Sequence, residues 1–392
     1  MATQFEQRYG FARSDVTLAT WRKSPYSRWS FQNVREAVPD MQISCAGERA
    51  EDAPVSPDAL LSETIRIGDK NETVGAFLKR SDTDLLVAMK GGRFVADYVA
   101  PYADPDRPHI LFSISKSITG LLAGILAEMG VIDLDAPVID YVPDAKGGAF
   151  DGATIRHLLD MRVSLAFEES YLNQDGDYAR YRRATLWNPA IPGQPQESLR
   201  EFLLSLHQAP APHGGAFYYQ SPNSDFLGVL LEEAAGIRFA DLVSELIWQP
   251  LGARKHGAVS VDRAGTARVA GGISVTVRDL ARLGEMLRRG GTVGDGRRIA
   301  PSGWLHDMMT AGDAKAWAAG DLNLLIPGGR YRSKWYQTGD GAFCGIGIHG
   351  QWLYVDPERE TVIVKLSSQP LPQDDALDLE VITFLRALSP HL

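Results

Sequence analysis

A serine and a lysine stand three residues apart just before the most apolar stretch of the chain, in Ser113-Ile114-Ser115-Lys116. Positions i and i+3 on the first turn of a helix share one face, so the two side chains can meet. The helix N-terminus favours developing negative charge on the hydroxyl, and a lysine in a desolvated pocket can accept a proton. The spacing predicts a serine nucleophile beside a lysine base. A helix cap followed by a solvated lysine is the alternative.

A tyrosine is the second candidate for proton transfer. Residues 218–223 have the sequence Tyr-Tyr-Gln-Ser-Pro-Asn. The pKa of a free tyrosine is about 10. An adjacent ammonium stabilises the phenolate, so Tyr219 can shuttle a proton between nucleophile and leaving group. Tyr218 is expected only to pack as an aromatic side chain.

Alternating glycines mark a third segment. Residues 344–350 have the sequence Cys-Gly-Ile-Gly-Ile-His-Gly. Glycine weakens a strand, so this alternation indicates close approach by a ligand or by another backbone. The N–H groups of such a strand can bind an oxyanion. A glycine-rich edge strand is the alternative interpretation.

The composition of the chain limits the classes of protein to which these residues can belong. The chain has 392 residues, 44% of them hydrophobic and 23% charged, with a formal net charge of −9. These values exclude a disordered, collagen-like or coiled-coil protein and disfavour nucleic acid as a partner. Cys45 and Cys344 are too few for a disulfide framework. The eight histidines lack ligand spacing, so neither a metal nor a cofactor is expected. The absence of a long apolar run and of a signal pattern leads us to expect a cytoplasmic protein without membrane contact.

Sequence patterns outline the elements that would position these residues. Residues 1–60 are predicted to be an extended segment wrapped on the body, and residues 164–198 a long surface loop. Helices are expected at 73–80, 118–129, 154–161, 225–235, 239–248, 277–287 and 375–388. Strands are expected at 84–90, 93–99, 349–355 and 361–366. This order predicts one sheet built from both ends of the chain, with a helical region inserted between them.

Together the motifs resemble the serine beta-lactamase and penicillin-binding-protein superfamily. The resemblance covers roughly residues 80–370 and includes Tyr-x-Ser-x-Asn at 219–223 and Ile-Val-Lys-Leu-Ser-Ser at 363–368. Within the superfamily the chain is most similar to the class C-like esterase branch and its nylon-oligomer hydrolases. The resemblance implies an α/β fold of the beta-lactamase/transpeptidase type, with an antiparallel sheet flanked by helices and a mostly helical inserted subdomain.

The implied domains are an α/β domain formed by residues 1–112 and 265–392, and a helical subdomain at 113–264. The active site is expected between them. The implied nucleophile is Ser113, with Lys116 assisting its deprotonation and Tyr219 as general acid and base. The backbone N–H groups of Ser113 and Ile348 would bind the oxyanion.

The implied substrate contacts show departures from the superfamily. Tyr171, Gly347 and His349 are expected beside the substrate, together with Ser221, where many relatives have asparagine. The usual third motif carries a cation, but Gly345-Ile346-Gly347 stands in its place here. In the nylon-oligomer hydrolases an acidic loop residue favours the ammonium end of the substrate. Arg182 falls at that position, and Ala270 replaces a helpful polar residue.

The sequence therefore predicts a serine hydrolase that forms an acyl-enzyme on small carboxylic esters, with linear amides such as 6-aminohexanoate oligomers as a further class. A beta-lactamase or D-Ala-D-Ala peptidase and a non-catalytic acyl-ligand binding protein are the alternatives. An alpha/beta-hydrolase is disfavoured, because the chain has no Gly-x-Ser-x-Gly pentapeptide. The expected partner is a small ester or amide, and a homodimer stays open.

Overall fold

The computed structural model describes residues 2–392 and contains three sheets, whose paired strands are all antiparallel. The largest sheet has seven strands in the order β5-β4-β13-β12-β11-β10-β9. Its strands span Thr83–Lys90 (β4), Arg93–Val99 (β5), Arg330–Arg332 (β9), Trp335–Gln337 (β10), Phe343–Gly347 (β11), Gln351–Asp356 (β12) and Thr361–Ser367 (β13). The sheet therefore joins early and late parts of the chain, as predicted.

Central strands of this sheet are buried on both faces, which explains their nearly continuous apolar sequences. Leu85 and Val87 of β4 point into one hydrophobic core, and Leu86 and Ala88 point into the other. Successive side chains of a strand face opposite sides, so one apolar run supplies both cores.

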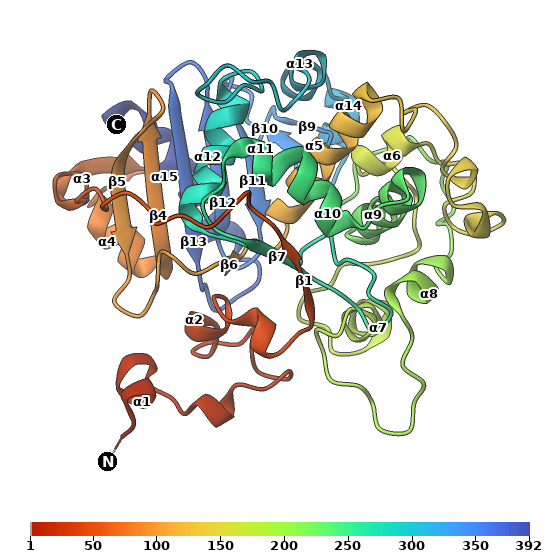
Figure 1. The fold of residues 1–392 in the computed structure, drawn as a ribbon, viewed down its shortest axis with the longest axis horizontal. Helices are drawn as coiled ribbons and strands as arrows, with labels where there is room; N and C mark the ends of the chain where they lie inside the picture. The colour runs from red at the N-terminus through yellow and green to blue at the C-terminus, as the bar shows by residue number, and fades with distance from the viewer. Residues whose placement is uncertain (1) are drawn as a thin grey trace.

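Helices cover each face of the large sheet. On one face lie α12 (Val277–Arg288) and α5 (Ile114–Glu128), and on the other lie α4 (Val74–Arg80) and α15 (Asp375–Leu388). The sheet is thus sandwiched between helical layers (Figure 1).

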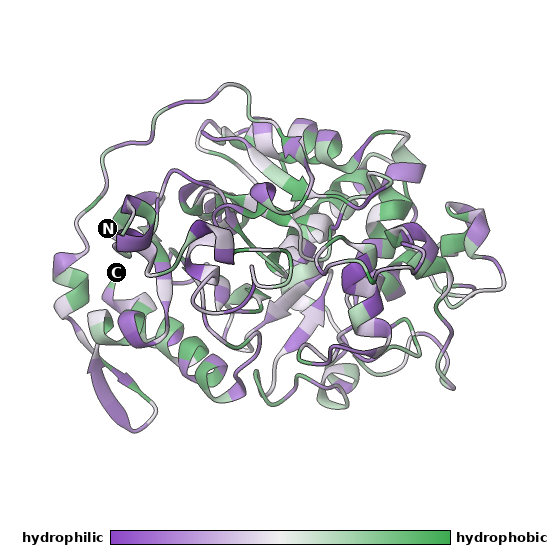
Figure 2. Cartoon of the chain, turned by 90° about the horizontal axis from the view of Figure 1, so that it is seen from below, coloured by the Kyte–Doolittle hydropathy of each residue, from purple (hydrophilic) through white to green (hydrophobic). Residues whose placement is uncertain are grey.

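The remaining helices lie mainly to the right of this sheet in Figure 1. They are α6 (Ile155–Leu159), α7 (Gly176–Ala184), α8 (Leu199–Leu204), α9 (Pro222–Ala235), α10 (Phe239–Val243), α11 (Gln249–Leu251), α13 (Ser302–Thr310) and α14 (Ala314–Ala318). Helical ribbons of the molecule carry both hydrophilic and hydrophobic residues, as expected for helices with one buried face (Figure 2).

A second sheet has the strand order β1-β7-β8-β6 and lies beside the start of α5. Its strands are β1 (Asp40–Ile43), β6 (His109–Ile110), β7 (Gly257–Ser260) and β8 (Ile273–Val275), and a separate hairpin pairs β2 (Thr64–Ile67) with β3 (Lys70–Thr73). The N-terminal segment also contains the short helices α1 (Gln4–Tyr9), α2 (Ser27–Ser30) and α3 (Asp58–Ser62).

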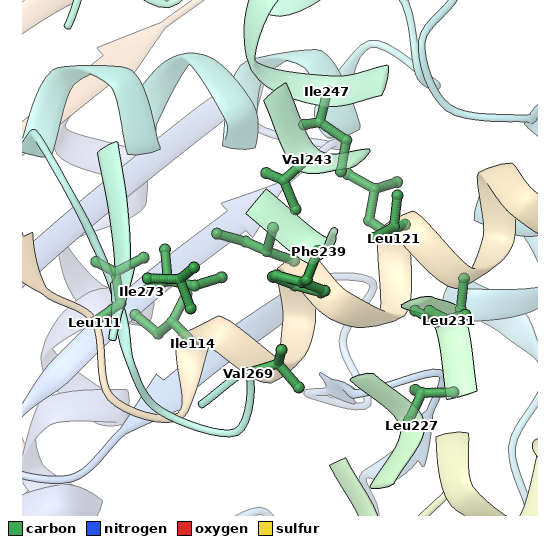
Figure 3. Close-up of a cluster of buried hydrophobic side chains, with 14 of the residues drawn as sticks. Leu111, Ile114, Leu121, Leu227, Leu231, Phe239, Val243, Ile247, Val269 and Ile273 are labelled. Atoms are coloured by element: carbon green, nitrogen blue, oxygen red, sulfur yellow. The ribbon is translucent and has the colours of Figure 1, made fainter. Parts of the chain in front are cut away.

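The helix α5 is buried along nearly its whole length, as its Leu- and Ile-rich sequence predicts. Figure 3 shows Ile114 close to Leu111 and Ile273, with Phe239 packed further along the helix; all four belong to one core cluster. This packing fixes the first turn of α5, which carries the predicted nucleophile.

Two regional predictions are corrected by the structure. The segment 164–198 is not only a loop, because α7 lies within it and buries Tyr178 and Tyr181 against the core. The segment 1–60 is largely irregular, as predicted, but its residues 40–43 form β1 of the second sheet. Among residues 2–392, no helix is long and apolar enough to span a membrane.

Candidate active site

The Ser113 hydroxyl and the Lys116 amine are in contact at the start of α5. Ser113 precedes the helix as its N-cap, and Lys116 Nζ lies 2.7 Å from Ser113 Oγ. The same amine donates to the carbonyl oxygen of Ala270 over 2.6 Å. A single helix turn brings the two predicted residues together, and the alternative of a solvated lysine is wrong.

Burial controls the charge of Lys116. Its side chain is almost fully enclosed, with 1% of the residue exposed. Loss of hydration outweighs the attraction of the Glu169 carboxylate and lowers the pKa of Lys116 to about 7. About half of the amine is therefore neutral at pH 7, and that form can accept a proton.

Tyr219 faces the same lysine. Lys116 Nζ lies 5.0 Å from the centroid of the Tyr219 ring. Burial, reinforced by Glu169, raises the pKa of Tyr219 well above 10, although the Ser113 hydroxyl opposes this rise. The expectation of a phenolate stabilised by an ammonium is therefore wrong for the free protein. Tyr219 is a protonated phenol there and can donate a proton.

The glycines of β11 permit close backbone packing rather than an edge strand. At Gly347, an added Cβ would lie 2.5 Å from the Leu111 carbonyl oxygen and 3.1 Å from Ser113 N. At Gly345 it would meet Ser117 Oγ at 3.0 Å. Because β11 pairs with both β10 and β12, the edge-strand alternative is wrong.

This approach brings two backbone amides to the same cavity. Ser113 and Ile348 both line it, and neither N–H has a backbone or side-chain acceptor within residues 2–392. Two free N–H groups beside the Ser113 hydroxyl have the donor chemistry of an oxyanion hole.

The backbone just before Ser113 is strained. Phe112 has a φ of 45°, in the left-handed region that a bulky side chain rarely adopts. Its ring packs 5.0 Å from the Phe31 ring and 5.9 Å from the Trp187 ring, measured between centroids. Such strain costs about 1–3 kcal/mol and persists only where packing imposes it. The aromatic N-terminal segment therefore helps to hold Ser113 in place.

A cavity of about 1100 Å³ opens in front of Ser113. Its lining combines residues 113 and 162–220 with residues 321–378, so distant parts of the chain meet there. Tyr171 and Gly347 line it, as the resemblance implies. Within the described chain, the lining holds a single guanidinium, Arg162, and seven carboxylates: Glu168, Glu169, Asp175, Asp177, Asp321, Asp375 and Asp378.

His349 is not at the cavity wall. It is buried beside Phe31 and Phe112, and its Nδ1 lies 2.7 Å from the carbonyl oxygen of Gln369. Burial lowers the pKa of His349 to about 3, so the ring is neutral and Nδ1 donates to that carbonyl. Its role is to anchor the turn that follows β11, rather than to contact substrate.

Arg182 and Ala270 also lie behind the cavity wall. The Arg182 guanidinium donates to the Tyr171 carbonyl oxygen and stacks 4.2 Å from the centroid of the Tyr178 ring. Ala270 binds Lys116 through its carbonyl. Arg182 therefore supports the loop that carries Tyr171, and it is not the substrate contact that the resemblance implies.

Ser221 is buried, does not line the cavity and binds a carboxylate that does. Its backbone N–H and its hydroxyl donate to Glu169 at 2.5 Å and 2.6 Å. Glu169 also accepts from the Tyr171 hydroxyl at 3.1 Å. Glu169 lines the cavity and connects two predicted site residues, yet sequence reasoning missed it. Its only signal was its position within a polar segment that shows no period.

We expect Tyr219→Phe to lower kcat for p-nitrophenyl esters about 10²-fold, because the ring is kept and only the proton donor is lost. Tyr218→Phe is the matched control, since Tyr218 lines the same cavity but is 55% exposed and has no contact with Lys116. Steady-state kinetics of both variants would check this. Near-wild-type turnover by Tyr219→Phe would remove Tyr219 from proton transfer.

No cluster of three or more His, Cys, Asp or Glu side chains within residues 2–392 could hold a metal ion.

Known proteins share this fold and much of this sequence. The Beta-lactamase family model matches residues 71–387. The chain is 34% identical over 376 residues to the 6-aminohexanoate-dimer hydrolase of Paenarthrobacter ureafaciens, covering 94% of this chain and 92% of the relative. It is 33% identical over 173 residues to Esterase EstB of Burkholderia gladioli, covering 40% and 41% of the two chains.

Solved structures agree with these sequence matches. A Bacillus anthracis protein assigned as a 6-aminohexanoate-dimer hydrolase aligns with a TM-score of 0.87 at 25% identity, over 97% of this chain and 98% of the other. EstCE1, a hydrolase with promiscuous acyltransferase activity, aligns with a TM-score of 0.59 at 17% identity, over 79% and 98% of the chains. The second likeness supports the fold alone.

Proposed function

The chain belongs to the beta-lactamase family of hydrolases, and on that premise we propose that it is a serine hydrolase acting through an acyl-enzyme. We propose small carboxylic esters as substrates, with linear amides such as 6-aminohexanoate oligomers as a second class. The observation that carries this proposal is the 2.7 Å contact between Lys116 Nζ and Ser113 Oγ at the cavity.

Acylation would begin when the neutral Lys116 amine takes the Ser113 proton and Oγ attacks the substrate carbonyl carbon. The N–H groups of Ser113 and Ile348 would then stabilise the oxyanion. As the C–O or C–N bond breaks, the Tyr219 phenol gives its proton to the leaving group. The Lys116 ammonium can restore that proton, so the proton lost by Ser113 leaves with the product.

Deacylation would use the same groups in reverse. Water attacks the acyl carbon, and its proton passes through Tyr219 and Lys116 back to Ser113 as the acid is released. One water molecule is consumed and the protein returns to its starting protonation state.

The acidic lining of the cavity supports linear amides with a cationic end as the second substrate class. Seven acidic side chains face one guanidinium, and although burial raises the pKa of Asp378 to about 7, the resulting field favours a cationic group on the substrate. Arg182 does not oppose the ammonium end of such a substrate, because its side chain lies behind Tyr171. The 6-aminohexanoate-dimer hydrolase relative agrees with this class. Rates on a panel of esters and ω-amino amides would rank the two classes.

We expect nitrocefin to be hydrolysed at least ~10²-fold more slowly than p-nitrophenyl acetate, compared as kcat/KM. The third-motif cation that would bind its carboxylate is replaced by Gly345, and the acidic lining repels it. Spectrophotometric assays of both substrates at one pH would check this. Nitrocefin turnover equal to ester turnover would revive the beta-lactamase alternative.

The proposed function is tested by fluorophosphonate treatment of the wild-type protein. We expect continuous release of nitrophenolate from p-nitrophenyl acetate or butyrate, and its loss after treatment. Hydrolysis that survives complete labelling would contradict the proposal. A burst of about one nitrophenolate per protein without turnover would instead favour the non-catalytic acyl-binding alternative.

A further inference from the structure

A buried ion pair lies two hydrogen bonds away from Lys116. Arg268 Nη1 binds Asp225 Oδ2, and their side chains are 5% and 0% exposed. The Tyr181 hydroxyl donates to the same carboxylate oxygen over 2.5 Å. Neither charged residue lines the cavity, so the pair does not contact substrate.

The other oxygen of this carboxylate connects the pair to the lysine. Asp225 Oδ1 accepts the backbone N–H of Ala270 at 2.7 Å, and the Ala270 carbonyl oxygen accepts from Lys116 Nζ at 2.6 Å. The Arg268 carbonyl accepts the N–H groups of Gly271 and Gly272, which closes the turn around Ala270. Asp225 thus holds the peptide group before Ala270. The Arg268 carbonyl, through the Gly271 N–H, holds the following peptide group, whose oxygen binds the amine.

This contact restricts where the lone pair of the neutral amine can point. A carbonyl oxygen can only accept, so Ala270 occupies one N–H of Lys116. The lone pair is then free to receive the proton of Ser113 Oγ, which lies 2.7 Å away. A change in the Ala270 peptide would rotate the amine and misdirect the lone pair.

We propose that the Arg268–Asp225 ion pair positions Lys116 as the base and balances the charge around it. This inference rests on the proposed function, since it assigns support to the base of that reaction. Both residues act through Ala270 and are positioning residues.

The two charges of the pair act on the pKa of Lys116 in opposite directions. Arg268 lowers the pKa of Lys116 and Asp225 raises it, so the two charges of the intact pair oppose each other. The other groups facing Lys116 are Glu169, the Tyr219 ring and the buried amine of Lys334. Burial lowers the pKa of Lys334 far below its ordinary value, which disfavours a positive charge there.

Two single substitutions should therefore shift the pH–rate profile in opposite directions. Asp225→Asn leaves the Arg268 cation uncompensated, so the acidic limb of kcat/KM should move to lower pH. Arg268→Gln leaves the Asp225 anion, so the limb should move to higher pH. We expect each shift to be about 0.5 pH unit or more and each kcat to fall about tenfold or more. The double variant should recover the wild-type limb but not the wild-type kcat.

Arg268→Lys keeps the charge and loses the planar guanidinium. It should retain the wild-type limb with a reduced kcat, and it serves as the second variant if the charge-removing variants do not fold. A limb displaced by Arg268→Lys would contradict the charge argument.

The chain offers a matched control in Arg278 and Asp97, a second buried pair with an N–O distance of 2.6 Å and 5% exposure on each side. Asp97→Asn should lower thermal stability without shifting the acidic limb of kcat/KM.

The assay is hydrolysis of p-nitrophenyl acetate across pH, after showing that wild-type activity depends on Ser113. Absence of that dependence would refute the proposed function. Active Asp225 and Arg268 variants whose limbs do not move, or move together, would overturn this inference.

Discussion

Ser113→Ala should abolish ester hydrolysis, with kcat/KM falling at least ~10⁴-fold. The substitution removes the only atom that would form the acyl bond, while α5 keeps its buried packing. Residual rates would come from the oxyanion donors and the general base acting on bound water. Kinetics on p-nitrophenyl acetate would measure the loss.

Ser170→Ala is the matched control for that experiment, because Ser170 also lines the cavity but is not part of the Ser–Lys turn. Its kcat/KM should stay within about threefold of wild type, since surface substitutions usually perturb little. Equal losses in the two variants would show that the cavity, rather than Ser113, is being disturbed.

Lys116→Ala should lower kcat about 10³-fold, because the deprotonation of Ser113 loses its base. In the wild-type protein, activity should rise with pH through about 7, since the pKa of Lys116 is lowered to about 7 and only the neutral amine accepts a proton. The alanine variant should lose this acidic limb as well as rate. A full pH–rate profile of each protein would check both effects.

A second buried lysine provides the control for Lys116. Lys365 is fully buried, its pKa is also lowered to about 7 by burial, and its Nζ lies 2.6 Å from Ser367 Oγ. It does not line the cavity. Lys365→Met should therefore change stability without removing the limb near pH 7. Loss of the limb in this variant would break its assignment to Lys116.

The groups with the strongest sequence signals are those whose positions depend on local geometry. Ser113 and Lys116 meet because one helix turn separates them, and the apolar run after them predicts the helix that fixes that turn. The hairpin at residues 84–99 and the helix at 375–388 were predictable for the same reason, since each has its own period and boundaries.

Residues whose roles depend on distant contacts could not be placed from the sequence. The resemblance implied that Arg182 and His349 contact the substrate, but tertiary packing turns both side chains toward backbone carbonyls. Glu169 lies in a segment without periodicity, and its importance depends on Ser221, 52 residues later. The partnership of Asp225 with Arg268, 43 residues apart, is visible only in the fold.

The protonation states of Lys116 and Tyr219 could not be predicted from the sequence either. A tyrosine next to a lysine was expected to lose its proton more readily. Burial reverses that expectation, because it lowers the pKa of Lys116 and raises that of Tyr219. Near pH 7 the neutral fraction of the amine can therefore accept a proton, and the phenol beside it can donate one.

The most direct test of the central claim is peptide mass spectrometry of protein treated with a fluorophosphonate. We predict one adduct per chain, located on Ser113, with its formation slowed in Lys116→Ala and absent in Ser113→Ala. An adduct on a different residue in the wild-type protein, or no adduct while ester hydrolysis continues, would contradict Ser113 as the nucleophile.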